Sequence, residues 1–324
     1  MTTLALTRRL PAALRWRPDT HEVVAAALSG HVRVLQNRIV PLLPELPRAR
    51  LAELAHLDDR SWHRLLTDPS APGLLGGGLG PEEPAAAVQA LLDGARARPV
   101  ARVHGIPVDV SNARTAPVFA RLDAAFDGAA DHGEAGLAGL GQALGAALAA
   151  LSTNAYVQGL ITGCVRVISV RRDASRTPSS SSWPSLPGYI RLWNADRGDL
   201  GWLMDAVLHE AVHGLLYMVE EQESWFTDPA APWASSMRSP WSGRDLPLHS
   251  FVQACFVWFA LVCFWREAEV EGADGMFRRA ARGFEDGRLP AVIRSLPAVD
   301  PAVREVLLDL AAQARDLVSS RATA

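Results

Sequence analysis

The segment LHEAVHGLL, residues 208–216, decides how the rest of this sequence is interpreted. It contains the pattern HExxH, made by His209, Glu210 and His213. On a helix, positions i and i+4 lie about 40° apart and one turn along the axis, so both imidazoles can reach one metal ion. Glu210 lies about 60° further round from His213, where it can contact a water or substrate on the metal more easily than the metal itself. The segment therefore predicts a metal-binding face on a helix.

The residues around the motif predict the elements that hold it. Apolar residues at helical spacing extend the motif helix over roughly 199–223, and Asp196 or Asp199 is its expected N-cap. Two β-branched stretches precede it, VRVISVRR at 165–172 and YIRLW at 189–193, and both are typical of strands. The serine-rich segment 173–188 between them is expected to be a polar, turn-rich connection.

Helices dominate the remaining prediction. Segments with helical periodicity are 20–45, 82–96, 115–127, 134–151, 248–269, 273–283 and 300–319, and residues 100–110 read as one or two short strands. Pro41 is expected to kink or end the first of these helices. The predicted fold class is α+β, predominantly helical, with a small β-sheet packed beside the HExxH helix. We expect a helical N-terminal region, 1–150, and a metal-binding catalytic region, 151–324, in one compact unit.

Composition narrows the classes of partner and chemistry. The net charge of −3 gives no reason to expect nucleic acid. The chain contains no lysine, so chemistry through a lysine Schiff base is excluded. Its three cysteines lack metal-ligand spacing and no signal peptide is recognised, which favours the cytoplasm. The longest apolar run, 251–265, is shorter than the roughly 20 residues of a membrane span and is expected to be a buried core helix.

A third metal ligand is needed, and the residues leave several candidates. His249 follows a proline-rich turn and opens the apolar helix, so it is the first candidate. Glu267, Glu269 and Glu271 are rivals, since a second helix can supply a glutamate to a zinc protease. The longer metzincin motif is absent, because Leu216 and Val219 stand where its glycine and third histidine would be.

Three stretches together resemble a known family. TPSSSSWPSLPGYIRLW, LHEAVHGLLYMVE and SPWSGRDLPLHSFVQACFVWFALVCFW are similar, in this order, to the catalytic half of the HExxH-type peptide β-hydroxylases. These are iron(II)- and 2-oxoglutarate-dependent enzymes associated with clusters for ribosomally made, modified peptides (RiPP biosynthesis). The resemblance covers roughly residues 152–270.

The resemblance implies a site and a reaction. His209, His213 and His249 would hold iron(II), and Arg244 would bind a carboxylate of 2-oxoglutarate. The stretch RDLPLH is shorter than the family's and lacks its glycine, and a gapped alignment puts Gln253 in the ligand position instead. Glu210 would act in catalysis, and the apolar residues Phe251, Phe256, Trp258 and Phe259 would exclude water. The implied substrate is a peptide, such as a leader-bearing precursor.

Two other functions fit the same residues. A zinc metallopeptidase would use the two histidines as ligands and Glu210 as general base for a zinc-bound water. A non-catalytic helical protein could recognise a leader peptide and keep the motif as a structural remnant.

Overall fold

The computed structural model of the chain describes residues 4–46, 101–109, 134–285 and 287–322, together with positions 48, 51, 54, 56, 65 and 66. Helices form most of this part of the chain, and one five-stranded sheet lies beside them. This confirms the predicted α+β, predominantly helical class. The helices expected at 82–96 and 115–127 lie outside the described residues.

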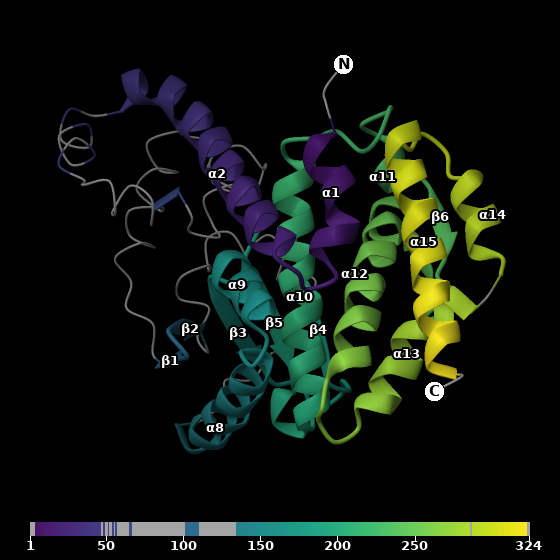
Figure 1. Cartoon of the computed structure of the whole chain (residues 1–324). Helices are drawn as coiled ribbons and strands as arrows, with labels where there is room; N and C mark the ends of the chain where they lie inside the picture. The colour runs from purple at the N-terminus through teal and green to yellow at the C-terminus, as the bar shows by residue number, and fades with distance from the viewer. Residues whose placement is uncertain are drawn as a thin grey trace.

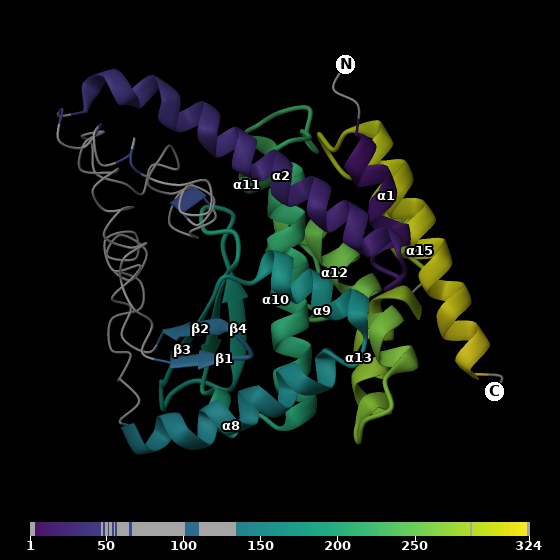
Figure 2. The same cartoon turned by 60° about the vertical axis from the view of Figure 1, so that its left-hand side comes forward.

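The HExxH helix is α10, Leu200–Glu220, and it occupies the middle of the molecule. Its N-cap is Asp199, whose carboxylate accepts a hydrogen bond from the backbone N–H of Trp202 at 2.7 Å. Figure 2 shows the sheet on one side of α10 and the helices α12 and α13 on the other. The motif helix is therefore packed against other elements on two sides, as its apolar residues predict.

The other helices surround α10 (Figure 1). Their bounds are α1 (Ala5–Ala13), α2 (Asp19–Ile39), α8 (Glu134–Leu151), α9 (Ala155–Cys164), α11 (Ala231–Ala234), α12 (Leu248–Glu267), α13 (Ala273–Glu285), α14 (Leu289–Arg294) and α15 (Pro301–Ala322). The helix expected over 20–45 ends at Ile39 and continues as the 3₁₀ helix η1, Val40–Glu45. Pro41 explains this end, because it has no N–H to donate to the carbonyl four residues earlier.

The sheet joins the two halves of the chain. Its strands are β1 (Ala101–Val103), β2 (Ile106–Asp109), β3 (Val167–Arg171), β4 (Ser179–Ser182) and β5 (Tyr189–Trp193), in the order β1-β2-β3-β5-β4. The β2–β3 and β3–β5 pairs are parallel, whereas β1–β2 and β4–β5 are antiparallel. The strands expected near 165–172 and 189–193 are confirmed, and so are two short strands within 100–110.

Strand β4 corrects the expectation of a turn-rich connection over 173–188. Four consecutive serines pair with β5, from Ser179 opposite Trp193 to Ser182 opposite Ile190. Serine has no strong preference for strands, so the pairing depends on the neighbouring strand and on contacts of the hydroxyl groups. The loop after α10 also contains a hairpin, made by β6 (Ser236–Arg238) and β7 (Asp245–Pro247).

The apolar helix α12 lies in the core, as expected. Among the described residues it alone is long and apolar enough to cross a membrane, and 89% of its apolar window is buried inside the protein. It packs against α10, α13 and α15. The apolar surface of α12 is thus accounted for by contacts within this fold.

Candidate metal centre

His209 and His213 are the two partly exposed residues in the otherwise buried middle of α10. Every residue from Leu203 to Val219 is buried except these two histidines, which are partly exposed. Their neighbours on the helix pack against the sheet and against α12. A ligand that approaches this stretch of α10 therefore meets the two imidazoles.

The separation of the two imidazole rings is compatible with a shared metal ion. Their ring centroids lie 5.0 Å apart, with an angle of 56° between the ring planes. Two imidazoles on one metal, each with a nitrogen about 2.1 Å from it, have centroids about 4.6–5.3 Å apart. Burial lowers the pKa of both histidines, and the charges of His213 and Arg279 lower the pKa of His209 further. Both rings are thus held in the neutral form that offers a lone pair to a metal.

Glu210 points to the sheet side of α10. Its side chain accepts a hydrogen bond from Ser180 Oγ at Oε1, 2.7 Å, and from Ser182 Oγ at Oε2, 2.6 Å. Residues two apart on a strand share a face, so the spacing of the two serines matches both carboxylate oxygens. Each oxygen keeps a further lone pair. The carboxylate is buried, and its expected contact with a water or substrate on a metal stays a prediction.

Gln253 on α12 orients His213 from the other side. Its amide nitrogen donates to Glu220 Oε2 at 3.0 Å, so its oxygen Oε1 faces His213 Nδ1 at 2.7 Å. An oxygen can only accept, and His213 therefore carries its proton on Nδ1 and leaves Nε2 for a metal. This arrangement, in which an outer residue fixes the ring of a ligating histidine, is usual around protein metal sites. The gapped alignment suggested Gln253 as a metal ligand. In the structure it instead contacts His213, one of the two candidate ligands.

His249 lies one side chain away from the histidine pair. Its Nε2 is 2.8 Å from Glu220 Oε2, and its ring stacks between Tyr217 and Trp233, with centroids 6.2 and 4.7 Å away. Tyr217 in turn stacks on His213 at 5.7 Å, so the tyrosine ring separates the two histidines. Within the described ranges, no three His, Cys, Asp or Glu side chains are grouped so that they could share a metal. The structure brings His209, Glu210 and His213 together and leaves His249 beside them.

The glutamates proposed as rival ligands lie elsewhere. Helices α10 and α12 are aligned so that His213 meets Gln253 and His209 meets Trp258, whose ring centroid is 5.6 Å away. Glu267 follows nine residues after Trp258, about 14 Å further along α12, and its carboxylate faces Arg17 at 3.4 Å. Glu269 and Glu271 follow the end of the helix and are exposed.

One arginine whose charge acts on His209, Arg279, was not among the predictions. Arg244 is exposed in the turn between β6 and β7. Arg279 on α13 lies over the ring of Trp258, 5.5 Å from its centroid, and pairs with Asp205 at 3.7 Å. Its charge contributes to the lowered pKa of His209, and its side chain is 50% exposed, so it can still accept an anionic ligand.

The arginines on β3 and β5 face away from Glu210. Arg191 stands opposite Ser181 on β4, whereas the serines that bind Glu210 are the residues on either side, which point to the opposite face. Arg171 shares the face of Arg191, because it lies two residues from Ser169, the partner of Arg191 on β3. The strand arginines are therefore on the far side of the sheet from the motif.

Some of the residues in this site could have been found from spacing alone. Glu220 follows His213 by seven residues, two turns of helix, and so lies on the same face. Ser180 and Ser182 could not be found in this way, because a row of polar residues carries no strand signal. Arg279 left no such signal, because its position depends on how α13 packs against α12.

No protein-family model matches the chain, and no curated protein matches it. The resemblance to the peptide β-hydroxylases therefore rests on the residues quoted from the sequence.

Proposed function

We propose that this protein is an iron(II)- and 2-oxoglutarate-dependent oxygenase that hydroxylates the β-carbon of a residue in a peptide. The observation that carries the proposal is the pair of partly exposed imidazoles, 5.0 Å apart in the buried middle of α10. We propose a cytoplasmic location, with which three buried free cysteines agree.

The residues at the site divide into ligands and supporting groups. His209 and His213 would hold the metal, and Gln253 would fix the orientation of His213. Bound iron would supply the activation of O₂, with 2-oxoglutarate converted to succinate and CO₂ while one oxygen atom enters the peptide C–H bond. Arg279 would bind a carboxylate of 2-oxoglutarate, and Trp258 would keep water from the ring of His209.

The same contacts distinguish this proposal from a zinc metallopeptidase. Such an enzyme holds zinc with a third protein ligand besides the two histidines. In one group of these enzymes that ligand is a glutamate from a second helix. The aligned residues of α12 are Gln253 and Trp258, neither of which is a carboxylate. An iron(II) oxygenase also takes a third protein ligand, and His249, which lies beside the pair, is the candidate for it.

Anaerobic reconstitution tests the proposal without knowledge of the peptide. Metal-free protein is loaded with one equivalent of iron(II), and 2-oxoglutarate is added under nitrogen. We expect the visible charge-transfer band of 2-oxoglutarate chelated to iron(II), and succinate once O₂ is admitted. A zinc-loaded sample that cleaves peptides, with no band and no succinate in the iron-loaded sample, would establish the metallopeptidase. Peptide binding without either reaction would establish the non-catalytic alternative.

A further inference from the structure

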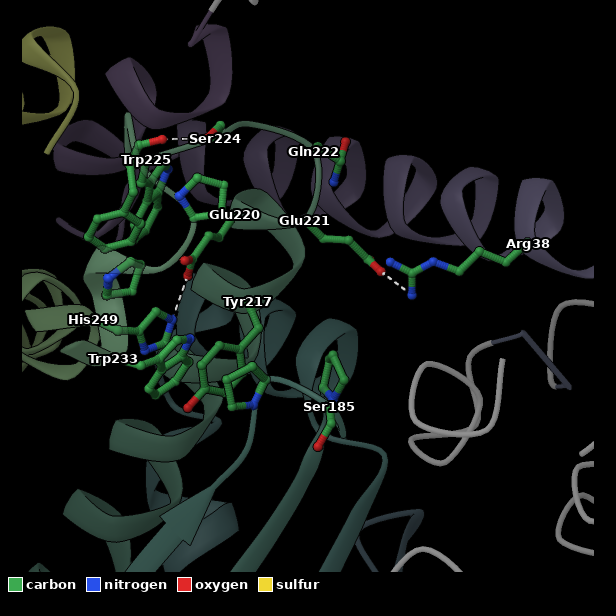
Figure 3. A pocket seen from close by; sticks show the side chains of 15 residues that line it. Arg38, Ser185, Tyr217, Glu220, Glu221, Gln222, Ser224, Trp225, Trp233 and His249 are labelled. Atoms are coloured by element: carbon green, nitrogen blue, oxygen red, sulfur yellow. Dashed lines mark hydrogen bonds and ion pairs between the residues drawn. The ribbon is translucent and has the colours of Figure 1, made fainter. Parts of the chain in front are cut away.

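A pocket of about 640 Å³ opens at the C-terminal end of α10, and the ring of Tyr217 lies between it and His213. Figure 3 shows its aromatic walls, with Tyr217, Trp225 and Trp233 around Glu220 and His249. Phe226 completes this wall, and prolines at 184, 187, 229 and 232 line the rest. The volume is in the range of pockets that hold small organic ligands or a few residues of a peptide.

Trp233 gives the pocket an exposed aromatic rim. It is 61% exposed and stacks on the ring of His249 at 4.7 Å. It is the most exposed large apolar side chain among the described residues, ahead of Val40 and Leu200. An exposed tryptophan at the mouth of a pocket is typical of ligand-binding surfaces.

The pocket also contains a carboxylate without a permanently charged partner. Glu221 is paired with Arg38 at 3.0 Å (Figure 3) and with His31 at 2.6 Å. Glu220 accepts from the amide of Gln253 and faces the imidazole of His249, both at Oε2, and no arginine pairs with it in the described part of the chain. Its other oxygen, Oε1, remains able to accept hydrogen bonds from a ligand in the pocket.

Electron-rich ring faces around a carboxylate attract an organic cation. We propose that this pocket binds an arginine side chain of the peptide substrate, with the guanidinium paired to Glu220 and stacked on Trp233. The planar guanidinium is preferred to an ammonium, because the rings of Tyr217, His249 and Trp233 already form a stack of flat groups. In naming the ligand a peptide substrate, this inference rests on the proposed function.

The distance from the pocket to the histidine pair limits how many residues can separate the arginine from the hydroxylated residue of the peptide. Glu220 follows His213 by seven residues, about 10 Å along α10. Tyr217 links the two places, since it lines the pocket and stacks on His213 at 5.7 Å. An extended peptide covers about 10 Å with three residues. The hydroxylated residue would therefore lie within about three residues of the arginine.

Binding to the metal-free protein tests this inference independently of any oxygenase activity. The probe is the peptide acetyl-Ala-Ala-Arg-Ala-Ala-amide, compared by calorimetry with the same peptide carrying citrulline or lysine in place of arginine. We expect the arginine peptide to bind at least about tenfold more tightly than either. Equal affinity of the arginine and citrulline peptides would overturn the inference, and equal affinity of the lysine peptide would overturn its choice of a guanidinium.

Two variants locate the binding in the pocket. Glu220→Gln removes the charge with little change of shape, and Trp233→Leu removes the exposed ring without touching the core. Each should weaken the arginine peptide about tenfold or more and leave the citrulline peptide unchanged. The matched control is Glu269→Gln, an exposed glutamate outside the pocket. Unchanged affinity in Trp233→Leu, together with a folded circular dichroism spectrum, would place the site elsewhere and overturn the proposal.

Discussion

Gln253 faces Nδ1 of His213 at 2.7 Å and, through its amide nitrogen, holds Glu220 at 3.0 Å. One amide thus fixes which nitrogen of His213 is free for a metal. Removing it by Gln253→Leu should weaken metal binding about 10- to 100-fold without abolishing it. Titration of metal-free protein with iron(II) or zinc against a competing chelator measures this. A variant that binds metal as tightly as the wild type would show that the ring of His213 needs no such support.

The histidines themselves should be indispensable. We expect His209→Ala and His213→Ala each to abolish stoichiometric metal binding, because each removes one of two ligands on the same helix face. The fold should persist, since the other side chains of α10 around them are buried among apolar neighbours. Metal content after dialysis and thermal unfolding are the two measurements. Retention of one metal per chain in either variant would end the hypothesis of a metal site here.

Glu210 should be needed for turnover and dispensable for the metal. The Glu210→Gln amide keeps the shape and still accepts a hydrogen bond through its oxygen, but it is no base. We expect normal metal content and loss of most succinate formation. Ser180→Ala serves as the control for its position, because it removes one of the two hydroxyl groups that hold the carboxylate. If Glu210→Gln loses metal as completely as the histidine variants, Glu210 is a ligand.

Two arginines compete for the carboxylate of 2-oxoglutarate. The sequence resemblance pointed to Arg244, whereas the structure places Arg279 over Trp258 and beside His209. We expect Arg279→Gln to raise the 2-oxoglutarate concentration for half-saturation by about ten- to a hundredfold, through loss of a charge-assisted contact. Arg244→Gln, in the exposed turn, should leave that concentration unchanged. An effect of Arg244→Gln with none of Arg279→Gln would assign the carboxylate contact to Arg244 instead.

The cysteines should be unreactive in the folded protein. Burial raises the pKa of Cys164, Cys255 and Cys263 to about 12, so the nucleophilic thiolate is scarce at pH 8. We expect no rapid reaction with a chromogenic disulfide reagent at that pH, and reaction of three thiols after unfolding in guanidinium chloride. The absorbance of the released thiol counts the reactive cysteines in the native and in the unfolded protein. A fast thiol in the native protein would indicate that one of the three is exposed.

The sequence predicted what depends on local pattern. Asp199 and the apolar periodicity located α10, and YIRLW located β5 to the residue. Contacts between distant segments were harder. Ser180 and Ser182 lie 30 and 28 residues from Glu210, and polar residues in a row carry no strand signal, so β4 was missed. The place of Arg279 depends on packing of α13, which no spacing in the sequence encodes.

Helix α1 is held by hydrogen bonds to a residue that the ribosome adds much later. Glu223, just after α10, accepts hydrogen bonds from the backbone N–H groups of Leu6 and Thr7 in the first turn of α1 at 2.8 and 2.9 Å. The two contacts span 217 and 216 residues of chain, which a ribosome adds in roughly 10 to 40 s. During that time Leu10 and Leu14, fully buried in the finished fold, lack their final partners. Because α1 also packs against α15, its buried leucines reach their final contacts only after α15 has been made.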